Sequence, residues 1–256
     1  MTQPPAKDLW IQRPRPRPGA RLRLFLLAHA GGGASAFRGW ADGIAADRVE
    51  VCPVQLPGRE NRLREPAYDR LPPLVEALSA ALERWRDLPY AVFGHSTGAL
   101  VAFELARHAA RAGMPGPVHL FASGRRAPDL PSRQRDVHQL PDGELLSELR
   151  SLGGFPQALL DHPELLELLL PVLRADLALT ETYTPTPGAT IAVPITAYIG
   201  DRDEKVTADE ARAWERHTTA AFHVRTFPGD HFYLFASRDL VLQALSTDLR
   251  SITATL

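Results

Sequence analysis

The pentapeptide Gly94-His95-Ser96-Thr97-Gly98 is the local feature that points most directly to chemistry. It has the form G-x-S-x-G, in which a serine on a sharp turn between a strand and a helix projects its hydroxyl as a nucleophile. The apolar string YAVF runs directly into it, and the helical string ALVAFELARHAARA follows it. A tight glycine turn with a capping serine is the alternative. The strand, turn and helix in succession favour a nucleophile elbow with Ser96 as the nucleophile.

A serine hydroxyl is a poor nucleophile without a base and an acid that orients the base. On an α/β sheet these groups follow in the order serine, acid, histidine, each after a strand. The string ITAYIG is followed by Asp201 and Asp203, and the string FHVRTF is followed by a loop with His231. We therefore predict His231 as the general base. Asp203 lies farther along its loop than Asp201, so we predict Asp203 as the acid and expect Asp201 to stabilise the turn.

Acyl transfer also needs hydrogen-bond donors for the oxyanion that develops in the transition state. One predicted donor is the backbone N–H of Thr97, at the start of the helix. The second is expected from the glycine-rich loop at 29–35, where we choose Ala30 and keep Gly31 as a nearly equal alternative. The chain has neither a phosphate-binding glycine motif nor an H-E-x-x-H motif, so no cofactor and no metal are expected.

From residue 21 onward, short apolar runs alternate with longer amphipathic stretches. Continuous apolar runs are typical of parallel strands that helices cover on both faces. The strands are expected at Leu22–Leu27, Val49–Val54, Tyr90–Phe93, Val118–Ala122, Ile195–Ile199 and Phe222–Phe227. The helices are expected at about 70–87, 98–112, 207–217 and 238–250. The predicted fold class is therefore α/β, with a mostly parallel central sheet flanked by helices.

The region 128–187 breaks this alternation and contains no good strand. Two helical patterns replace it, one at Pro141–Leu152 and a leucine-rich one at Glu164–Glu181 that Pro171 interrupts. An insertion of this length is too long for an ordinary loop. We therefore predict a helical lid over one edge of the sheet.

Composition sets limits on the whole chain of 256 residues. The net charge of -1 gives no reason to expect a polyanionic partner, and 45% hydrophobic residues provide ample material for a core. Cys52 is the single cysteine, which excludes an intrachain disulfide and fits a reducing compartment. No segment approaches the ~20 apolar residues that span a bilayer, and residues 1–20 lack the apolar stretch of a signal peptide. We expect a cytoplasmic protein with a solvated, extended leader at 1–20 and one domain at 21–256.

With these groups placed, the chain resembles the type II thioesterases, the free-standing editing hydrolases of polyketide synthase and nonribosomal peptide synthetase pathways. The strings VQLPGRE and SGRRAP have no general meaning across α/β-hydrolases, so the resemblance is more specific than the elbow alone. The stretches that carry it are HAGGGAS (29–35), VQLPGRE (54–60), FGHSTGALVAFELAR (93–107), SGRRAP (123–128), LPDGELLSELRSLGG (140–154), LLLPVLRADLALTETY (168–183) and FPGDHFYL (227–234).

The resemblance implies an α/β-hydrolase fold with an inserted helical lid and a triad of Ser96, Asp203 and His231. It also implies removal of acyl groups from the phosphopantetheine arm of an acyl or peptidyl carrier protein. We expect a monomer that binds neither nucleic acid nor membrane. A general carboxylesterase, an acyl-CoA thioesterase and a non-catalytic protein that binds carrier proteins are the alternatives.

Two positions depart from the family's usual pattern. Thr97 stands where methionine often follows the nucleophile, and Asp230 replaces the second of two glycines before His231. The backbone N–H of Thr97 survives the change, whereas Asp230 either stabilises the imidazolium or faces solvent. Arg125 and Arg126 either contact the phosphopantetheine phosphate or form a structural pair at the surface.

Overall fold

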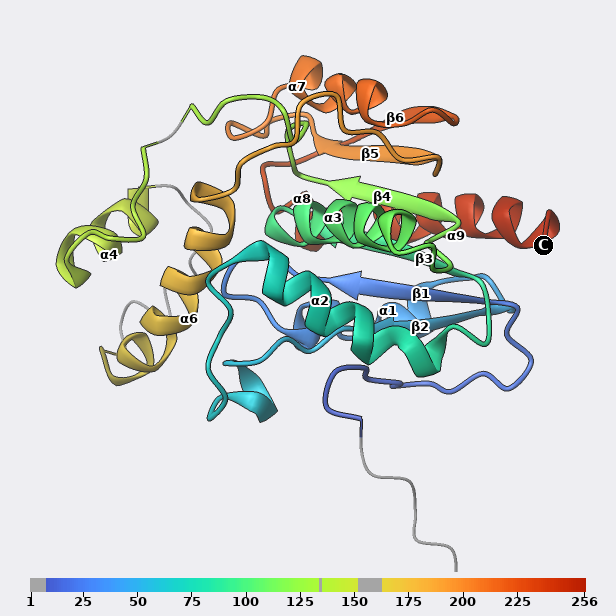
Figure 1. Cartoon of the computed structure of the whole chain (residues 1–256), viewed down its shortest axis with the longest axis horizontal. Helices are drawn as coiled ribbons and strands as arrows, with labels where there is room; N and C mark the ends of the chain where they lie inside the picture. Colours follow the sequence, from blue (N-terminus) through green and yellow to red (C-terminus); the bar gives the residue numbers. More distant parts are fainter. Residues whose placement is uncertain (1–7, 134, 152–162) are drawn as a thin grey trace, which may run out of the picture.

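A computed structural model describes residues 8–133, 135–151 and 163–256. Its central sheet has six strands in the order β2-β1-β3-β4-β5-β6, and all neighbours are parallel (Figure 1). The strands are β1 (Leu22–Leu27), β2 (Val49–Pro53), β3 (Tyr90–His95), β4 (His119–Ser123), β5 (Ile195–Gly200) and β6 (Phe222–Phe227). Every predicted strand is present, with only its ends shifted, so the predicted fold class is confirmed.

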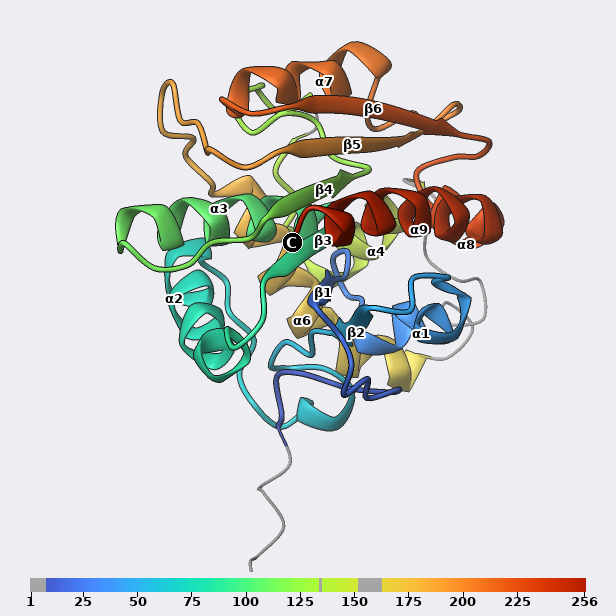
Figure 2. The same ribbon diagram turned by 90° about the vertical axis from the view of Figure 1, so that its right-hand side faces the viewer.

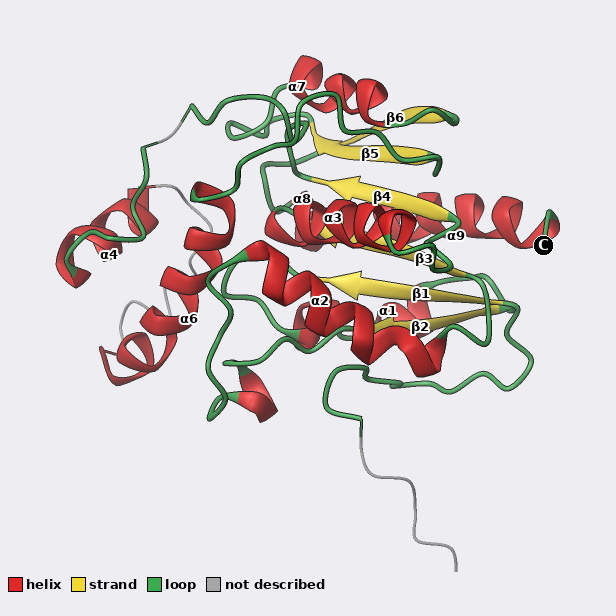
Figure 3. Ribbon diagram, in the orientation of Figure 1, coloured by secondary structure: helices red, strands yellow, loops and turns green. Residues whose placement is uncertain are grey.

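Helices cover both faces of the sheet, as the edge-on view in Figure 2 shows. The helices on one face are α2 (Leu71–Leu82), α3 (Thr97–Arg111) and α7 (Ala208–Arg212), and those on the other face are α1 (Trp40–Gly43), α8 (Tyr233–Ala236) and α9 (Arg238–Ala254). The loops that join strands to helices gather at the two ends of the sheet (Figure 3). Of these helices, the short α1 and α8 were not predicted, because four-residue helices leave no periodic pattern.

The core lies in two layers, one on each side of the sheet. Phe25 and Leu27 of β1 face the layer below α2 and α3, whereas Leu24 and Leu26 face the layer below α1 and α9. All six residues of β1 are buried. Alternate side chains of a strand point to opposite faces, so a strand covered on both sides is mostly apolar, and the one charged residue of β1, Arg23, is paired with Glu50 of β2. The continuous apolar runs in the sequence have this cause.

The lid helices α4 (Asp142–Ser151) and α6 (Pro163–Glu181) lie beyond the carboxyl ends of the strands (Figure 1). Contrary to the expected interruption, α6 continues through Pro171. Pro171 and Glu167 are both exposed, so water can reach the carbonyl of Glu167 that the missing proline N–H leaves unpaired. Part of the predicted lid, 134 and 152–162, lies outside the described residues.

Residues 8–20 are extended and largely exposed, but Ile11 and Ala20 are buried and the segment is attached to the sheet. Ile11 is 3% exposed and forms an antiparallel bridge with Val54, at the end of β2. The buried carboxylate of Glu50 accepts hydrogen bonds from the Arg13 side chain and from the backbone N–H of Arg17. The segment therefore packs along the edge strand of the sheet. In the described ranges no helix is long and apolar enough to cross a membrane.

Candidate active site

Ser96 lies at the sharp turn between β3 and α3, with φ 53° and ψ −113°. Residues other than glycine rarely adopt a positive φ, and such strain collects at functional positions. The flanking glycines make the turn possible. A Cβ on Gly94 would lie 2.2 Å from the Gly98 carbonyl oxygen, and a Cβ on Gly98 would lie 2.3 Å from the Leu27 carbonyl oxygen. The structure thus has the geometry of a nucleophile elbow.

His231 and Asp203 form a buried pair in the loops after β6 and β5. His231 Nδ1 lies 2.9 Å from Asp203 Oδ2. An ionised carboxylate can only accept hydrogen bonds, so Nδ1 carries the proton and Nε2 of the neutral ring is free to act as a base. Asp203 Oδ1 accepts the backbone N–H groups of Lys205 (2.8 Å) and Val206 (3.1 Å). Both carboxylate oxygens are therefore held in place.

The two other acidic residues of these loops have different partners. Asp201 Oδ1 accepts the Gly229 N–H at 2.8 Å, so this exposed residue ties the loop after β5 to the loop after β6. Asp230 is also exposed, and its Oδ1 accepts the Phe232 N–H at 2.8 Å. The structure therefore brings Asp203, and neither of these two, to the histidine.

Ser96 and His231 both contact the chain at the end of β4, at the carboxyl edge of the sheet. The Ser96 N–H donates to the Ser123 carbonyl at 2.8 Å. The next residue, Gly124, lies against the His231 ring, because a Cβ there would be 3.4 Å from His231 Cε1. Within the part of the chain that the structure describes, no hydrogen bond joins the Ser96 hydroxyl to His231. Such bonds often form only when substrate is bound.

Two further histidines line this edge, and both are neutral. The His95 ring lies 5.2 Å from the His231 ring, and its Nδ1 is 2.9 Å from Ser123 Oγ. Burial holds the pKa of His95 well below its usual value. Burial lowers the pKa of His29 to about 4. Neither ring therefore adds a positive charge near neutral pH.

One predicted oxyanion donor belongs to the elbow, and the other lies in the loop after the neighbouring strand β1. Thr97 is the first residue of α3, where backbone N–H groups have no acceptor within the helix. In the loop after β1, the Gly31 N–H is already used, because it donates to Asp176 Oδ2 at 2.7 Å. The Ala30 N–H has no acceptor among the described residues. This difference favours Ala30 over Gly31 as the second donor.

Sequence reasoning assigned no role to Asp176 or to its partner Arg59. Arg59 is 3% exposed and Asp176 is 2% exposed. Arg59 Nη1 lies 2.7 Å from Asp176 Oδ2, which joins the loop after β2 to the lid helix α6. Both residues belong to strings that carry the family resemblance, VQLPGRE and LLLPVLRADLALTETY. Their place in these two strings is the sequence signal that could have identified them as functional residues.

Arg125 and Arg126 follow β4 and are both half-buried. The Arg125 carbonyl accepts the Trp214 Nε1–H at 2.8 Å. Burial, with the neighbouring charge of Arg126, lowers the pKa of Arg125 to about 10. The backbone of Arg125 thus has a structural contact, and the predicted contact with phosphate stays a prediction.

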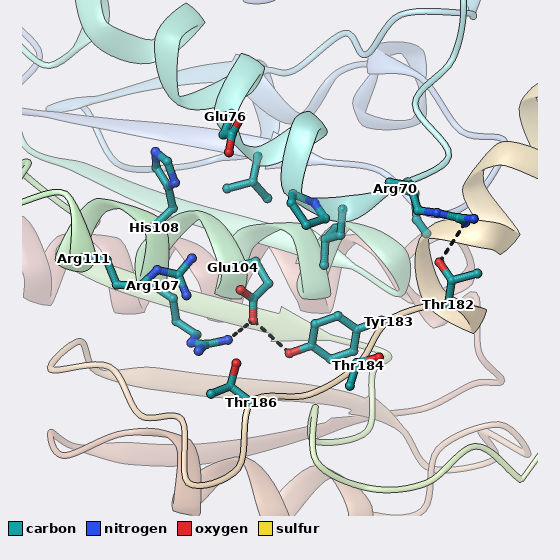
Figure 4. Close-up of a pocket in the computed structure, with 14 residues that line it drawn as sticks. Arg70, Glu76, Glu104, Arg107, His108, Arg111, Thr182, Tyr183, Thr184 and Thr186 are labelled. Carbon is teal, nitrogen blue, oxygen red and sulfur yellow. Dashed lines mark hydrogen bonds and ion pairs between the residues drawn. The ribbon is translucent and has the colours of Figure 1, made fainter.

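Two cavities lie beside this edge of the molecule. One, of about 620 Å³, lies between the loop at 58–69 and α6, and its lining includes the apolar residues Leu63, Pro66 and Val172. The other, of about 390 Å³, lies between α2, α3 and the chain after α6 (Figure 4). In it the Tyr183 hydroxyl donates to Glu104 at 2.8 Å. None of the predicted site residues lines either cavity. Among the described residues, no cluster of histidine, cysteine and acidic side chains could hold a metal ion.

The sheet, the strained serine after β3 and the histidine–aspartate pair after the last two strands define the class: the protein has the α/β-hydrolase fold. Residues 22–249 match the family model described as "Thioesterase domain". The chain is 40% identical over 245 residues to "Gramicidin S biosynthesis protein GrsT" of Aneurinibacillus migulanus, covering 96% of this chain and 95% of that relative. It belongs to the thioesterase family and is a thioester hydrolase.

Solved structures agree with this assignment. RedJ, a thioesterase from the prodiginine biosynthetic pathway in Streptomyces coelicolor, is 44% identical with a TM-score of 0.84, and the match covers 96% of both chains. BorB, a type II thioesterase from the borrelidin biosynthetic cluster, is 40% identical with a TM-score of 0.85, covering 95% of this chain and 98% of that one. The resemblance to type II thioesterases is therefore confirmed.

Proposed function

We propose that the protein hydrolyses acyl thioesters on the phosphopantetheine arm of acyl or peptidyl carrier proteins. It would thereby remove aberrant or stalled acyl groups in polyketide or nonribosomal peptide biosynthesis. The observation that carries the proposal is the buried hydrogen bond of 2.9 Å between His231 and Asp203, beside the elbow of Ser96, in a member of the thioesterase family. The relatives named above belong to biosynthetic pathways, which supports a carrier-bound substrate.

In the acylation step, Ser96 Oγ attacks the thioester carbonyl carbon while His231 Nε2 takes the hydroxyl proton. Asp203 keeps the ring in the tautomer with the proton on Nδ1 and stabilises the imidazolium. The N–H groups of Ala30 and Thr97 stabilise the tetrahedral oxyanion, by about 3 kcal/mol per donor. The intermediate then breaks the carbon–sulfur bond, and the departing thiolate takes the proton from His231. The acyl group is left as an ester on Ser96.

In the deacylation step, water takes the place of the thiol. His231 removes a proton from the water as its oxygen attacks the acyl ester, and then returns the proton to Ser96 Oγ. The products are the free carboxylic acid and the original enzyme. Every proton in this cycle is moved by His231, so the chemistry proposed here needs no cofactor and no metal. The lid would line the path of the acyl chain and the pantetheine arm.

We also propose that the enzyme is a monomer and that it is cytoplasmic. A monomer suffices, because the proposed triad and both oxyanion donors come from one chain. A cytoplasmic location is supported by Cys52, which is a free thiol and the single cysteine of the sequence, as is common in reducing compartments. Cys52 is fully buried, and burial raises its pKa to about 12, so it takes no part in the thioester chemistry. Nucleic acid and membrane are not proposed as partners.

The test compares the wild type with Ser96→Ala on an acyl-carrier protein, an acyl-CoA and a simple ester at equal concentrations. We expect Ser96→Ala to lose at least about 10³-fold in rate and to lose labelling by a fluorophosphonate. Ser251→Ala, at an exposed serine of α9, is the matched control and should behave as the wild type. Retained hydrolysis in Ser96→Ala would overturn the mechanism. Equal rates on all three substrates would instead favour a general carboxylesterase or acyl-CoA thioesterase.

A further inference from the structure

Asp176 lies on the lid helix, yet its carboxylate reaches the loop after β1. Its Oδ2 accepts the Gly31 N–H at 2.7 Å and also Arg59 Nη1 at 2.7 Å. Its Oδ1 accepts Arg59 Nη2 at 2.9 Å. Arg59 Nη1 also donates to the Gly32 carbonyl at 3.1 Å. One buried ion pair therefore holds two successive residues of the glycine-rich loop.

The part of the loop that it holds is a β-turn. The Gly32 N–H donates to the His29 carbonyl at 2.9 Å, which closes a turn with Ala30 and Gly31 at its centre. Gly31 has φ +75°, the value that the third residue of a type II turn requires. The common type I turn differs by a flip of the central peptide, which here is the one that carries the Gly31 N–H. The bond to Asp176 selects the type II form and so fixes the central peptide, whereas the bond from Gly32 to His29 fixes the peptide before it.

The Ala30 N–H lies on the first peptide of the turn, and Asp176 and Arg59 act on it by anchoring the turn as a whole, through the Gly31 N–H and the Gly32 carbonyl. The Ala30 N–H and the His29 carbonyl belong to one peptide group and point in opposite directions. The carbonyl accepts the Gly32 N–H, which fixes the orientation of this peptide. A type II turn leaves the N–H groups of both central residues outside its own hydrogen bond. Asp176 takes the one on Gly31, and the one on Ala30 remains for a ligand. Leu173 Cδ2 would lie 2.6 Å from a Cβ at residue 31, so the lid helix also closes the space beside this turn.

We infer that Asp176 is a positioning residue for the oxyanion hole: with Arg59, it holds the loop at residues 29–32 in the turn that presents the Ala30 N–H. This inference rests on the proposed function, in which that N–H meets the oxyanion. A carboxylate suits the role because three donors meet it, two from Arg59 and one from Gly31. Arg59 compensates the buried charge, which would otherwise be strongly unfavourable.

The test is Asp176→Asn, measured with an acyl-pantetheine thioester. An amide has a single acceptor oxygen and places an NH2 group among the three donors. We expect kcat to fall about 10- to 100-fold with KM changed less than about threefold, because the donor acts on the transition state. The affinity for a trifluoromethyl ketone analogue, whose adduct with Ser96 carries an oxyanion, should fall in parallel. A merely structural role would lower the melting temperature and leave both quantities unchanged.

Glu50→Gln is the matched control, because Glu50 is 1% exposed and pairs with Arg23 at 3.1 Å, within strands β1 and β2. The same change from carboxylate to amide there should leave kcat and analogue affinity unaltered. If Asp176→Asn fails to fold, Arg59→Met combined with Asp176→Leu removes both charges together, a change that proteins often tolerate. The Gly31 N–H still loses its acceptor, so kcat should fall by the same factor.

The inference is overturned if either variant folds and keeps kcat and analogue affinity within about twofold of the wild type. Asp176 would then only fasten the lid to the loop. Ser96→Ala, assayed in parallel, separates this result from a failure of the proposed function. A loss of activity in Ser96→Ala with full activity in Asp176→Asn rejects the positioning role alone, whereas activity in Ser96→Ala rejects the mechanism itself.

Discussion

Asp203→Asn is the substitution whose consequence follows most directly from the hydrogen bonds of the site. Asp203 accepts from two backbone N–H groups on one oxygen and from His231 on the other. Asparagine has one carbonyl oxygen, which should turn toward the two N–H groups of Lys205 and Val206. Its NH2 group then faces His231 Nδ1, which must give up its proton to accept a hydrogen bond. The neutral ring is left with its proton on Nε2, where the base is needed.

The expected magnitude comes from this change of tautomer. The corresponding substitution in a serine protease triad lowers kcat about 10⁴-fold while the geometry stays intact. A loss of 10⁴ is equivalent to about 5.5 kcal/mol of transition-state stabilisation. The fold should change little, because both backbone N–H groups keep their acceptor. We expect the free energy of unfolding to fall by about 1 kcal/mol, as for one hydrogen bond.

The assay is steady-state hydrolysis of an acyl-pantetheine thioester, with urea denaturation run on the same samples. Asp201→Asn is the matched control, because among the described residues that exposed carboxylate accepts only from Gly229. It should keep kcat within about threefold of the wild type. A loss below tenfold in a fully folded Asp203→Asn protein would refute the tautomer argument and the assignment of the acid.

Two further predictions concern stability. Gly98→Ala should lower the free energy of unfolding by about 3 kcal/mol in denaturant titrations, because its Cβ would lie 2.3 Å from the Leu27 carbonyl oxygen. Gly143→Ala, where a Cβ meets nothing within 4 Å, should not, and equal losses would contradict the packing argument. Burial lowers the pKa of His119 from 6.5 to about 4, so the unfolded chain binds a proton that the folded chain refuses. His119 alone should therefore contribute about 3 kcal/mol to the loss of stability as the pH falls from 6.5 to 4. His119→Gln should reduce the loss over this pH range by that amount, and an unchanged loss would disprove the lowered pKa of His119.

The parts of the site that depend on local strings could be predicted from the sequence. The elbow needs only a strand, two glycines, a serine and a helix, all within contiguous residues around Ser96. The sheet was predictable for a similar reason, because a strand covered on both faces is a short, mostly apolar run of contiguous residues. The order of Asp203 and His231 then followed from the strands that precede them.

The parts that depend on a distant partner could not be predicted. The contacts of residues 8–20 with the sheet are an example, because nothing in the segment shows that Ile11 pairs with Val54 or that the buried Glu50 binds Arg13. The choice between Ala30 and Gly31 stayed open for the same reason. The acceptor that takes the Gly31 N–H lies 145 positions away, on a lid helix that no property of the loop indicates.

That long-range contact also limits how the lid can work. Leu173 and Asp176 are three residues apart, so they lie on one face of α6 and both meet the turn at Gly31. A shift of the helix by one residue is about 1.5 Å along its axis. Such a shift would break the 2.7 Å bond to Gly31 and the pairing with Arg59 together. If Asp176 positions the turn, we therefore expect the segment around 173–176 to stay in place during turnover and entry of the acyl chain to depend on other parts of the lid.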